Sequence, residues 1–195
     1  MKIKKALLIV DVQNDFCPGG ALGIKDGDKI IPTINKYIKN FASKKLPIFA
    51  SRDWHPIQTV HFKGFGGVWP QHCIQDTKGA AFHPKLKLPK ETILLYKGMD
   101  PEQDSYSAFQ AQDKSGISLS NLLKILDIKE LYIAGLATDY CVKFSALDAL
   151  KNGFKVRLLM DAIKGVDLKP NDSEKAIKEM IKKGAKITTL KDMEG

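Results

Sequence analysis

Cysteine is scarce in this sequence, and long apolar runs are missing. The chain of 195 residues has three cysteines, Cys17, Cys73 and Cys141. An odd number at wide spacing argues against a disulfide framework and favours reduced thiols. No apolar run approaches the roughly 20 residues that a membrane-spanning helix needs. The basic N-terminal segment leads into the apolar residues 6–10 and then Asp11, without a signal-peptide cleavage site, so we expect a cytoplasmic protein with no membrane partner.

Arginine is also scarce, which limits what the positive charge can mean. The formal net charge is +9, from 31 lysines and arginines against 22 aspartates and glutamates. Arg52 and Arg157 are the only arginines, and the lysines are spread along the chain without an aromatic-interleaved cluster. Arginine is the usual side chain for reading phosphates and guanines. We therefore interpret the charge as a lysine-rich solvated surface and expect no nucleic-acid partner.

The order of apolar segments predicts a single α/β domain over residues 1–195. Short apolar runs alternate with segments of helical period, which is typical of a parallel sheet covered on both faces. The expected strands are residues 6–10, 47–51, 92–96, 131–134, 156–160 and 186–189. Helices are expected to begin near Ile30, after Ser118, after Thr138 or Asp139, and near Asp172, with the hydroxyl or carboxylate residues as N-caps. This pattern predicts a three-layer α/β/α architecture around a mostly parallel six-stranded sheet.

Residues 54–91 interrupt this alternation. They show neither a sustained helical period nor a strand period, and they hold both tryptophans and all four histidines. A loop of this length without secondary structure of its own is usually functional in a compact domain. Ligands of open α/β sheets bind at the carboxyl ends of the strands. We therefore expect residues 54–91 to form an active-site and metal-binding region at that edge.

Three chemically reactive side chains follow three of the predicted strands. Asp11 follows the first strand, Lys97 the third, and Cys141 lies after the fourth, in the first turn of a predicted helix. The positive end of a helix dipole favours a thiolate there. A carboxylate can accept the thiol proton, and an ammonium stabilises the thiolate. Singly these residues have ordinary interpretations, as a cap, a solvated lysine and a buried thiol, but together they indicate a nucleophilic cysteine site.

A second group of side chains suits a metal ion. Asp53 and His55 share one face of an extended segment, and His61 and His72 follow in the loop. A carboxylate with imidazoles is typical of a divalent transition metal that keeps open positions, whereas closed structural sites are rich in thiolates. The alternative is that these are packed or solvated loop histidines, and we interpret His83 in that way.

Five segments in this order resemble the nicotinamidases of the isochorismatase-like cysteine hydrolase superfamily. They are DVQNDFCPGGAL from Asp11, RDWHP from Arg52, WPQHC from Trp69, KG from Lys97 and GLATDYCVKFSALDA from Gly135. The match runs along nearly the whole chain. The resemblance implies a six-stranded parallel α/β fold, in agreement with the apolar pattern. It also implies hydrolysis of nicotinamide, and of pyrazinamide, to the acid and ammonia through a cysteine thioester, as a step of NAD salvage.

The resemblance further implies catalytic roles for single residues. It implies a triad of Asp11, Lys97 and Cys141. It also implies a cis peptide between Leu136 and Ala137, and an oxyanion hole made by the N–H groups of Ala137 and Cys141.

Binding residues are implied in the same way. The implied metal ligands are Asp53, His55 and His72. Zinc is the first candidate, with iron and manganese as alternatives, because this ligand set accepts all three. Phe16 and Trp69 match positions that sandwich the substrate ring, and Tyr106 is implied to line the pocket.

One departure from the family pattern leaves a ligand open. Many relatives read DWHPxxHxSF, whereas this chain reads DWHPIQTVHF, with Thr59 at a histidine position and His61 at a serine position. Whether His61 contacts the metal is therefore undecided by the sequence.

Three other functions were weighed against this interpretation. A related hydrolase of another small amide or carbamoyl compound would keep the triad but has no obvious use for the metal ligands. A nucleotide-binding module is disfavoured because the loop after the first strand lacks a GxGxxG turn. A non-catalytic scaffold would bind metal without releasing ammonia. The sequence leaves the oligomeric state open, and a homo-oligomer is compatible with it.

Overall fold

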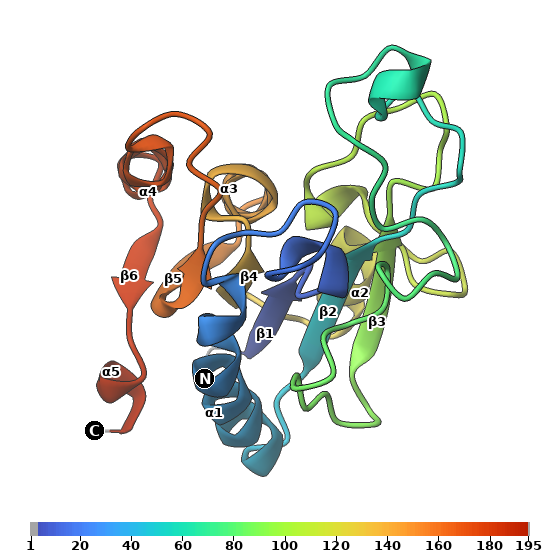
Figure 1. Ribbon diagram of the computed structural model, residues 1–195. Helices are drawn as coiled ribbons and strands as arrows, with labels where there is room; N and C mark the ends of the chain where they lie inside the picture. The colour runs from blue at the N-terminus through green and yellow to red at the C-terminus, as the bar shows by residue number, and fades with distance from the viewer. Residues whose placement is uncertain (1–3, 195) are drawn as a thin grey trace.

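The computed structural model describes residues 4–194, which form one six-stranded sheet with helices on both faces (Figure 1). The strands are β1 (Lys5–Val10), β2 (Ile48–Asp53), β3 (Ile93–Lys97), β4 (Glu130–Leu136), β5 (Lys155–Lys164) and β6 (Lys186–Thr188). Their order is β3-β2-β1-β4-β5-β6, and every neighbouring pair is parallel. The predicted parallel six-stranded sheet is confirmed. Because strands are added on one side of β1 and then on the other, the sheet has a topological switch point at β1 and β4.

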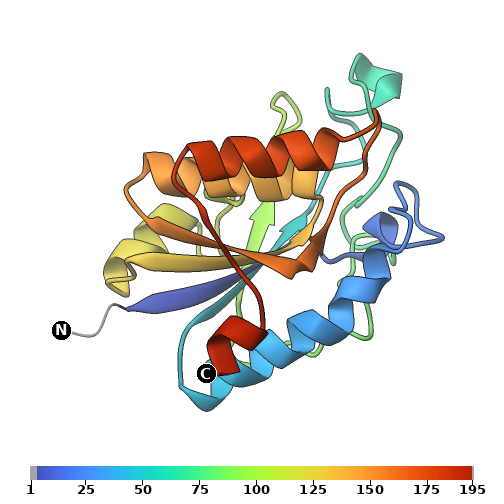
Figure 2. The same cartoon turned by 90° about the vertical axis from the view of Figure 1, so that its left-hand side faces the viewer.

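The helices divide between the two faces of the sheet. They are α1 (Ile31–Ser43), α2 (Leu119–Ile125), α3 (Lys143–Lys151), α4 (Asp172–Lys182) and α5 (Lys191–Glu194). Figure 2 shows α1 and α5 on one face and α3 and α4 on the other. Short turns complete the chain: η1 (Asn14–Phe16), η2 (Gly27–Ile30), η3 (Lys63–Phe65), η4 (Ala108–Gln110) and the π-helical η5 (Thr138–Val142). The expected three layers are therefore present.

The central strand β1 has apolar side chains on both faces because the sheet is covered on both. Leu7 and Ile9 pack into the core beneath α1, whereas Leu8 and Val10 pack into the core beneath α2, α3 and α4. All four side chains are fully buried. Full burial of each such side chain stabilises the folded protein by about 1.5–3 kcal/mol. The uninterrupted apolar run is therefore what a doubly covered parallel strand requires.

The helices predicted to begin near Ile30 and Asp172 do so, and the predicted N-caps were right in one case and wrong in another. The Ser118 hydroxyl accepts a hydrogen bond from the N–H of Asn121, as an N-cap does. Neither Thr138 nor Asp139 caps the helix after β4: Ala137 is at the cap position, without a side-chain cap bond. The Asp139 carboxylate instead accepts two main-chain N–H bonds from the loop after β5. The Asp139 carboxylate thus bonds N–H groups that are distant along the chain, and not the N–H groups of its own helix, as the sequence suggested.

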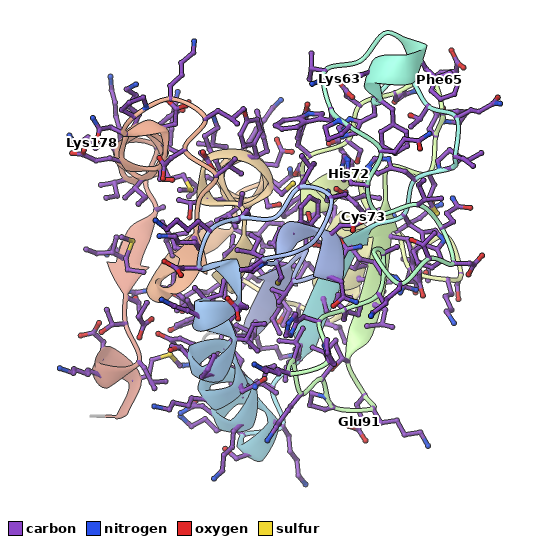
Figure 3. All side chains as sticks on the ribbon, viewed as in Figure 1. Lys63, Phe65, His72, Cys73, Glu91 and Lys178 are labelled. Atoms are coloured by element: carbon purple, nitrogen blue, oxygen red, sulfur yellow. The ribbon has the colours of Figure 1, made fainter. Side chains whose placement is uncertain are left out.

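The segment 54–91 has the irregular backbone that the sequence predicted. Its only helix is the short η3, and isolated bridges join His55 to Ile74 and Phe62 to Trp69. Figure 3 shows Lys63 and Phe65 at the tip of a projecting loop and His72 at its base, close to the sheet. The part of the segment that includes His72 therefore lies at the carboxyl ends of β1, β2 and β3, and the chain then returns to Glu91 at the opposite edge, where β3 begins.

Two further sequence expectations can be compared with the fold. The three cysteines are free thiols, as predicted, and all are buried. No helix within residues 4–194 has both the length and the apolar character needed to cross a membrane.

Candidate active site

Asp11, Lys97 and Cys141 meet at the carboxyl ends of β1, β3 and β4. Lys97 Nζ lies 2.9 Å from Asp11 Oδ2 and 3.6 Å from Cys141 Sγ. The Ser51 hydroxyl donates to Asp11 Oδ1 at 2.7 Å and fixes the other carboxylate oxygen. Asp11 and Lys97 are almost completely buried. The three residues singled out at separate strand ends therefore form one contiguous polar cluster.

Local backbone features bring Cys141 into this cluster. Val10 of β1 pairs with Gly135 of β4, and Gly135 has φ +119°, a conformation that side chains rarely adopt. A Cβ at this position would also overlap the main chain of Val10. The peptide between Leu136 and Ala137 is cis, as the family resemblance implied. The chain then enters η5, whose turn places Cys141 at the edge of the sheet.

Lys97 is shared between two carboxylates. It forms ion pairs with Asp11 and with Asp53, and the three side chains are buried. Burial alone would lower the pKa of Lys97, but the two carboxylates outweigh it and hold that pKa well above the usual range. Burial raises the pKa of Asp11, and Lys97 only partly opposes this change. A carboxyl group with a raised pKa is better suited to accept and return a proton near neutral pH.

Cys141 differs from the thiolate that its place in the sequence suggested. Burial raises the pKa of its thiol well above the usual value, and Asp11 and Asp53 add to this rise, while Lys97 opposes it. Desolvation and the two carboxylates outweigh the ammonium and the helix terminus, which favour the thiolate. The resting group is a thiol, so its proton must be removed during the reaction.

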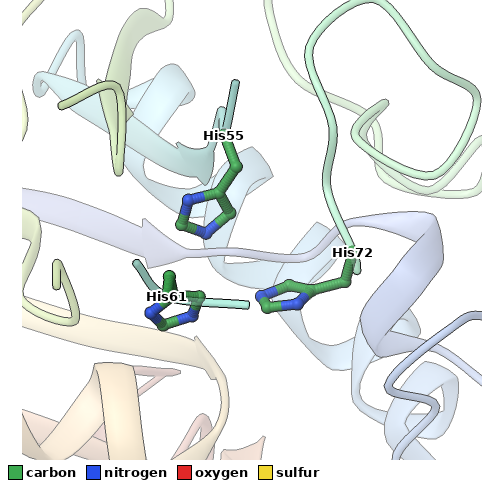
Figure 4. Close-up of side chains that lie close together, drawn as sticks. All are labelled: His55, His61 and His72. Atoms are coloured by element: carbon green, nitrogen blue, oxygen red, sulfur yellow. The ribbon is translucent and has the colours of Figure 1, made fainter. Parts of the chain in front are cut away.

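Asp53 and three imidazoles form a second cluster beside the first. Asp53 Oδ2 lies 3.7 Å from His55 Nε2 and 3.8 Å from His72 Nε2. Ring nitrogens of His55, His61 and His72 lie within 4.8 Å of one another. Figure 4 shows the three rings gathered around a common space. The structure thus adds His61, which the sequence left undecided, to the group.

The hydrogen bonds of these histidines fit a metal ion. Nδ1 of His55 lies 3.0 Å from the Gly98 carbonyl and Nδ1 of His72 lies 2.8 Å from the Pro70 carbonyl. A carbonyl only accepts, so each Nδ1 carries a proton, and Nε2 is then the nitrogen that a metal would bind. Within residues 4–194, the buried Nε2 of His55 has no hydrogen-bond partner. Orienting bonds of this type are what metal-ligating histidines usually have.

His61 and His72 are also in the protonation state that a metal requires. Burial lowers the pKa of His72 to about 4 and lowers that of His61, so both imidazoles are neutral at pH 7. His61 Nδ1 lies 2.5 Å from Asp104 Oδ1, which leaves Nε2 as its free nitrogen. A neutral imidazole is the form that binds transition metals. The donor set of one carboxylate and three imidazoles therefore fits a divalent ion.

A small cavity of about 50 Å³ joins the two clusters. Its walls include the predicted ring-binding residues Phe16, Trp69 and Tyr106, together with Cys141. Trp69 Nε1 donates to the Tyr106 hydroxyl at 2.9 Å, which holds the indole in place. The metal-donor side chains Asp53, His61 and His72 line the same cavity. A planar molecule of one ring could therefore contact the thiol and the donor cluster at once.

Comparison with known proteins assigns the family. The isochorismatase domain matches residues 5–192 of the chain. The chain belongs to the isochorismatase family.

Similar members of the isochorismatase family have been characterised. The nicotinamidase of Escherichia coli is 41% identical, and the alignment covers 97% of each chain. The structure of the pyrazinamidase of Pyrococcus horikoshii in complex with zinc has a TM-score of 0.89 and 46% identity, and covers 96% of this chain and 99% of that one. PnC1 from L. infantum in complex with nicotinate has a TM-score of 0.85 and 32% identity, and covers 98% and 97%. These likenesses confirm the isochorismatase fold.

Several lining residues of this isochorismatase-family site were not found from the sequence. Leu22, Tyr140 and Val166 line the cavity. Val166 lies two residues after the end of β5, but the predicted strand ended at residue 160, so the strand-end rule did not indicate it. Asp104, the partner of His61, is 43 residues away along the chain and has no local signal.

Proposed function

We propose that this enzyme hydrolyses nicotinamide to nicotinate and ammonia, and that pyrazinamide is also a substrate. The observation that carries the proposal is that one small cavity is lined by the Cys141 thiol and by the metal-donor side chains. A pyridine carboxamide has two functional groups at a fixed separation, and it would direct its carboxamide to the thiol and its ring nitrogen to the metal. The nicotinamidase and pyrazinamidase relatives, and the nicotinate bound to one of them, support the same substrate class.

We propose that Asp53, His55 and His72 hold one divalent transition metal, with His61 as a further ligand. Zinc is the first candidate because the similar pyrazinamidase is in complex with zinc, and iron and manganese are the alternatives. When bound, such an ion supplies a Lewis acid for the ring nitrogen of the substrate.

The aromatic residues of the cavity orient the substrate. Phe16 and Trp69 would contact the two faces of the pyridine ring, and the bond to Tyr106 keeps the indole from rotating. Ring binding fixes the direction of the carboxamide with respect to Cys141. Such orientation supplies a large share of the rate enhancement in reactions between two positioned groups.

The chemical steps use Asp11, Lys97 and Cys141. Asp11 accepts the Cys141 proton as the sulfur attacks the carboxamide carbon, and the N–H groups of Ala137 and Cys141 stabilise the oxyanion. Asp11 then donates the proton to the amide nitrogen, the C–N bond breaks, and ammonia leaves a thioester. A water molecule, deprotonated by Asp11, attacks the thioester carbon, and the C–S bond breaks to give nicotinate and the thiol. Lys97 keeps the developing negative charges stabilised throughout.

Ammonia release from a set of amides tests the substrate. Nicotinamide and pyrazinamide should be hydrolysed by the zinc-loaded enzyme. Benzamide has the same carboxamide on a ring without nitrogen, and its kcat/KM should be lower by about 100-fold or more because no ring atom can bind the metal. Equal rates for benzamide and nicotinamide would contradict the metal's role. Turnover of isochorismate without release of ammonia from nicotinamide would instead indicate a related hydrolase.

Replacement of Lys97 tests the electrostatic role of the buried ammonium. Lys97 lowers the pKa of Cys141, so Lys97→Met should raise that pKa and reduce the thiolate fraction at fixed pH. One pKa unit corresponds to a tenfold lower thiolate fraction. Alkylation of the Cys141 peptide by iodoacetamide, followed by mass spectrometry over a pH series, should slow at least tenfold near neutral pH.

The Cys17 peptide is the control for this experiment, and the folded state of the variant is checked separately. Burial and Asp28 raise the pKa of Cys17 to about 11, and neither depends on Lys97, so alkylation of the Cys17 peptide should not change. Lys97→Met leaves two buried carboxylates unpaired, a loss that costs about 3–5 kcal/mol, so the folded state must be verified by circular dichroism. An unchanged pH profile for the Cys141 peptide in the folded variant would show that Lys97 does not have this role.

We also propose a cytoplasmic location, which the three free thiols support. A homo-oligomer stays a prediction. The molar mass of the purified protein, measured by light scattering, would test it.

A further inference from the structure

The side chain of Gln13 continues the sheet beyond the end of β1. The last residue of β1, Val10, pairs with Ser51, while β2 extends to Asp53. At that point the amide of Gln13 lies beside β2: Gln13 Oε1 accepts from the Asp53 N–H at 2.8 Å, and Gln13 Nε2 donates to the Asp53 carbonyl at 2.8 Å. A side-chain amide therefore makes the two hydrogen bonds that a neighbouring strand would make.

Gln13 also connects this strand end to the returning part of the 54–91 segment. Its Nε2 donates a second hydrogen bond to the Ala80 carbonyl at 2.9 Å, and its main chain forms an antiparallel bridge with Phe82. Gln13 is fully buried, and both of its amide N–H groups have protein acceptors. On the opposite edge of β2, Asp53 pairs with Lys97 of β3. The main chain of Asp53 is therefore held from both sides.

We infer that Gln13 is a positioning residue for the metal site. Its amide fixes the main chain of Asp53 and thereby directs the Asp53 carboxylate toward His55 and His72. The inference rests on the ligand set given in the proposed function. Rotation of the Asp53 peptide would move Oδ2 away from the two imidazole nitrogens, which now lie at 3.7 and 3.8 Å. Groups that orient metal ligands typically change metal affinity 10- to 100-fold when they are removed.

A purely structural role for Gln13 predicts a different result. Loss of three buried hydrogen bonds lowers stability in either case, because main-chain groups of Asp53 and Ala80 lose their partners. Only the positioning role predicts weaker metal binding by protein that remains folded. Zinc affinity of the folded variant therefore separates the two roles without any measurement of catalysis.

The experiment compares two Gln13 variants with a matched glutamine. Gln13→Met keeps the length of the side chain and removes all three bonds. Gln13→Glu keeps an oxygen for the Asp53 N–H. Gln75→Met is the control. The side-chain amide of Gln75 donates to the carbonyl of Trp54 at 2.9 Å, one residue beyond Asp53. It therefore bonds the same stretch of chain without bonding the main chain of Asp53.

Zinc affinity of the metal-free proteins is measured by competition with a chromophoric chelator, at a temperature where circular dichroism shows each protein to be folded. Gln13→Met should bind zinc 10- to 100-fold more weakly than the parent, Gln13→Glu should fall between them, and Gln75→Met should stay within about twofold. Parental affinity in folded Gln13→Met, or an equal loss in Gln75→Met, would overturn the inference. If Gln13→Met does not fold, parental affinity in Gln13→Glu overturns it. A parent protein that does not bind zinc would contradict the ligand set itself, which is a distinct failure of the proposed function.

Discussion

Cys141→Ala should abolish nicotinamide hydrolysis, with a fall in kcat on the order of 10⁴-fold or more. The change removes the only sulfur that lines the cavity within residues 4–194, and a thioester cannot form without it. The fold and the zinc content should stay intact, because Cys141 is small and is not among the proposed metal ligands. The measurement is ammonia release, with zinc determined by plasma mass spectrometry on the same samples.

Cys17→Ala is the matched control for this variant. Cys17 is also a buried free thiol, and it immediately follows Phe16, which lines the cavity, but Cys17 itself does not line it. Activity should therefore stay within a few fold of the parent. More than trace activity in Cys141→Ala, with the substitution verified by mass spectrometry, would show that the nucleophile has been wrongly assigned.

His72→Ala should lose the metal, and with it most of the binding of the pyridine ring. His72 is buried, its Nδ1 is bonded to the Pro70 carbonyl, and its Nε2 faces Asp53. Removal of a metal ligand should weaken metal binding by more than the 10- to 100-fold that is typical when a group that only orients a ligand is removed. The zinc content after dialysis should fall from near one per chain toward zero, and kcat/KM for nicotinamide should fall at least 100-fold.

Asp53→Ala should lose the metal in the same way and should show an additional defect. Asp53 forms an ion pair with Lys97, so its removal also changes the environment of Asp11 and Cys141. Added zinc should therefore restore less activity to Asp53→Ala than to His72→Ala. His83→Ala is the control histidine, since His83 lies outside the cluster of imidazoles. Full zinc occupancy in His72→Ala or Asp53→Ala would show that the ligands are wrong.

The sequence could predict the sheet and the meeting of three reactive side chains because both follow from local rules. Apolar runs at β-strand length located the strands, and the convergence of parallel strands at one edge brought Asp11, Lys97 and Cys141 together. The chemistry of a carboxylate with imidazoles indicated the group of Asp53, His55 and His72 from the sequence alone. These inferences need residue type and position along the chain, and no knowledge of distant contacts.

The features that the sequence could not predict depend on contacts between distant segments. Gln13 bonds Asp53 across 40 residues, and Asp139 bonds main-chain groups after β5 instead of capping its own helix. The raised pKa of Cys141 results from burial, which the sequence does not report quantitatively.

The proposed ligands are distributed unevenly along the chain, and this affects more than catalysis. Asp53 ends a strand, whereas His55, His61 and His72 belong to a segment with almost no regular structure. An ion bound to all four acts as a cross-link that closes successive loops between residues 53 and 72. Closing loops in this way removes conformational freedom from the unfolded chain, as a disulfide does. In a protein whose cysteines are all free, such an ion would fasten the longest irregular segment to the sheet.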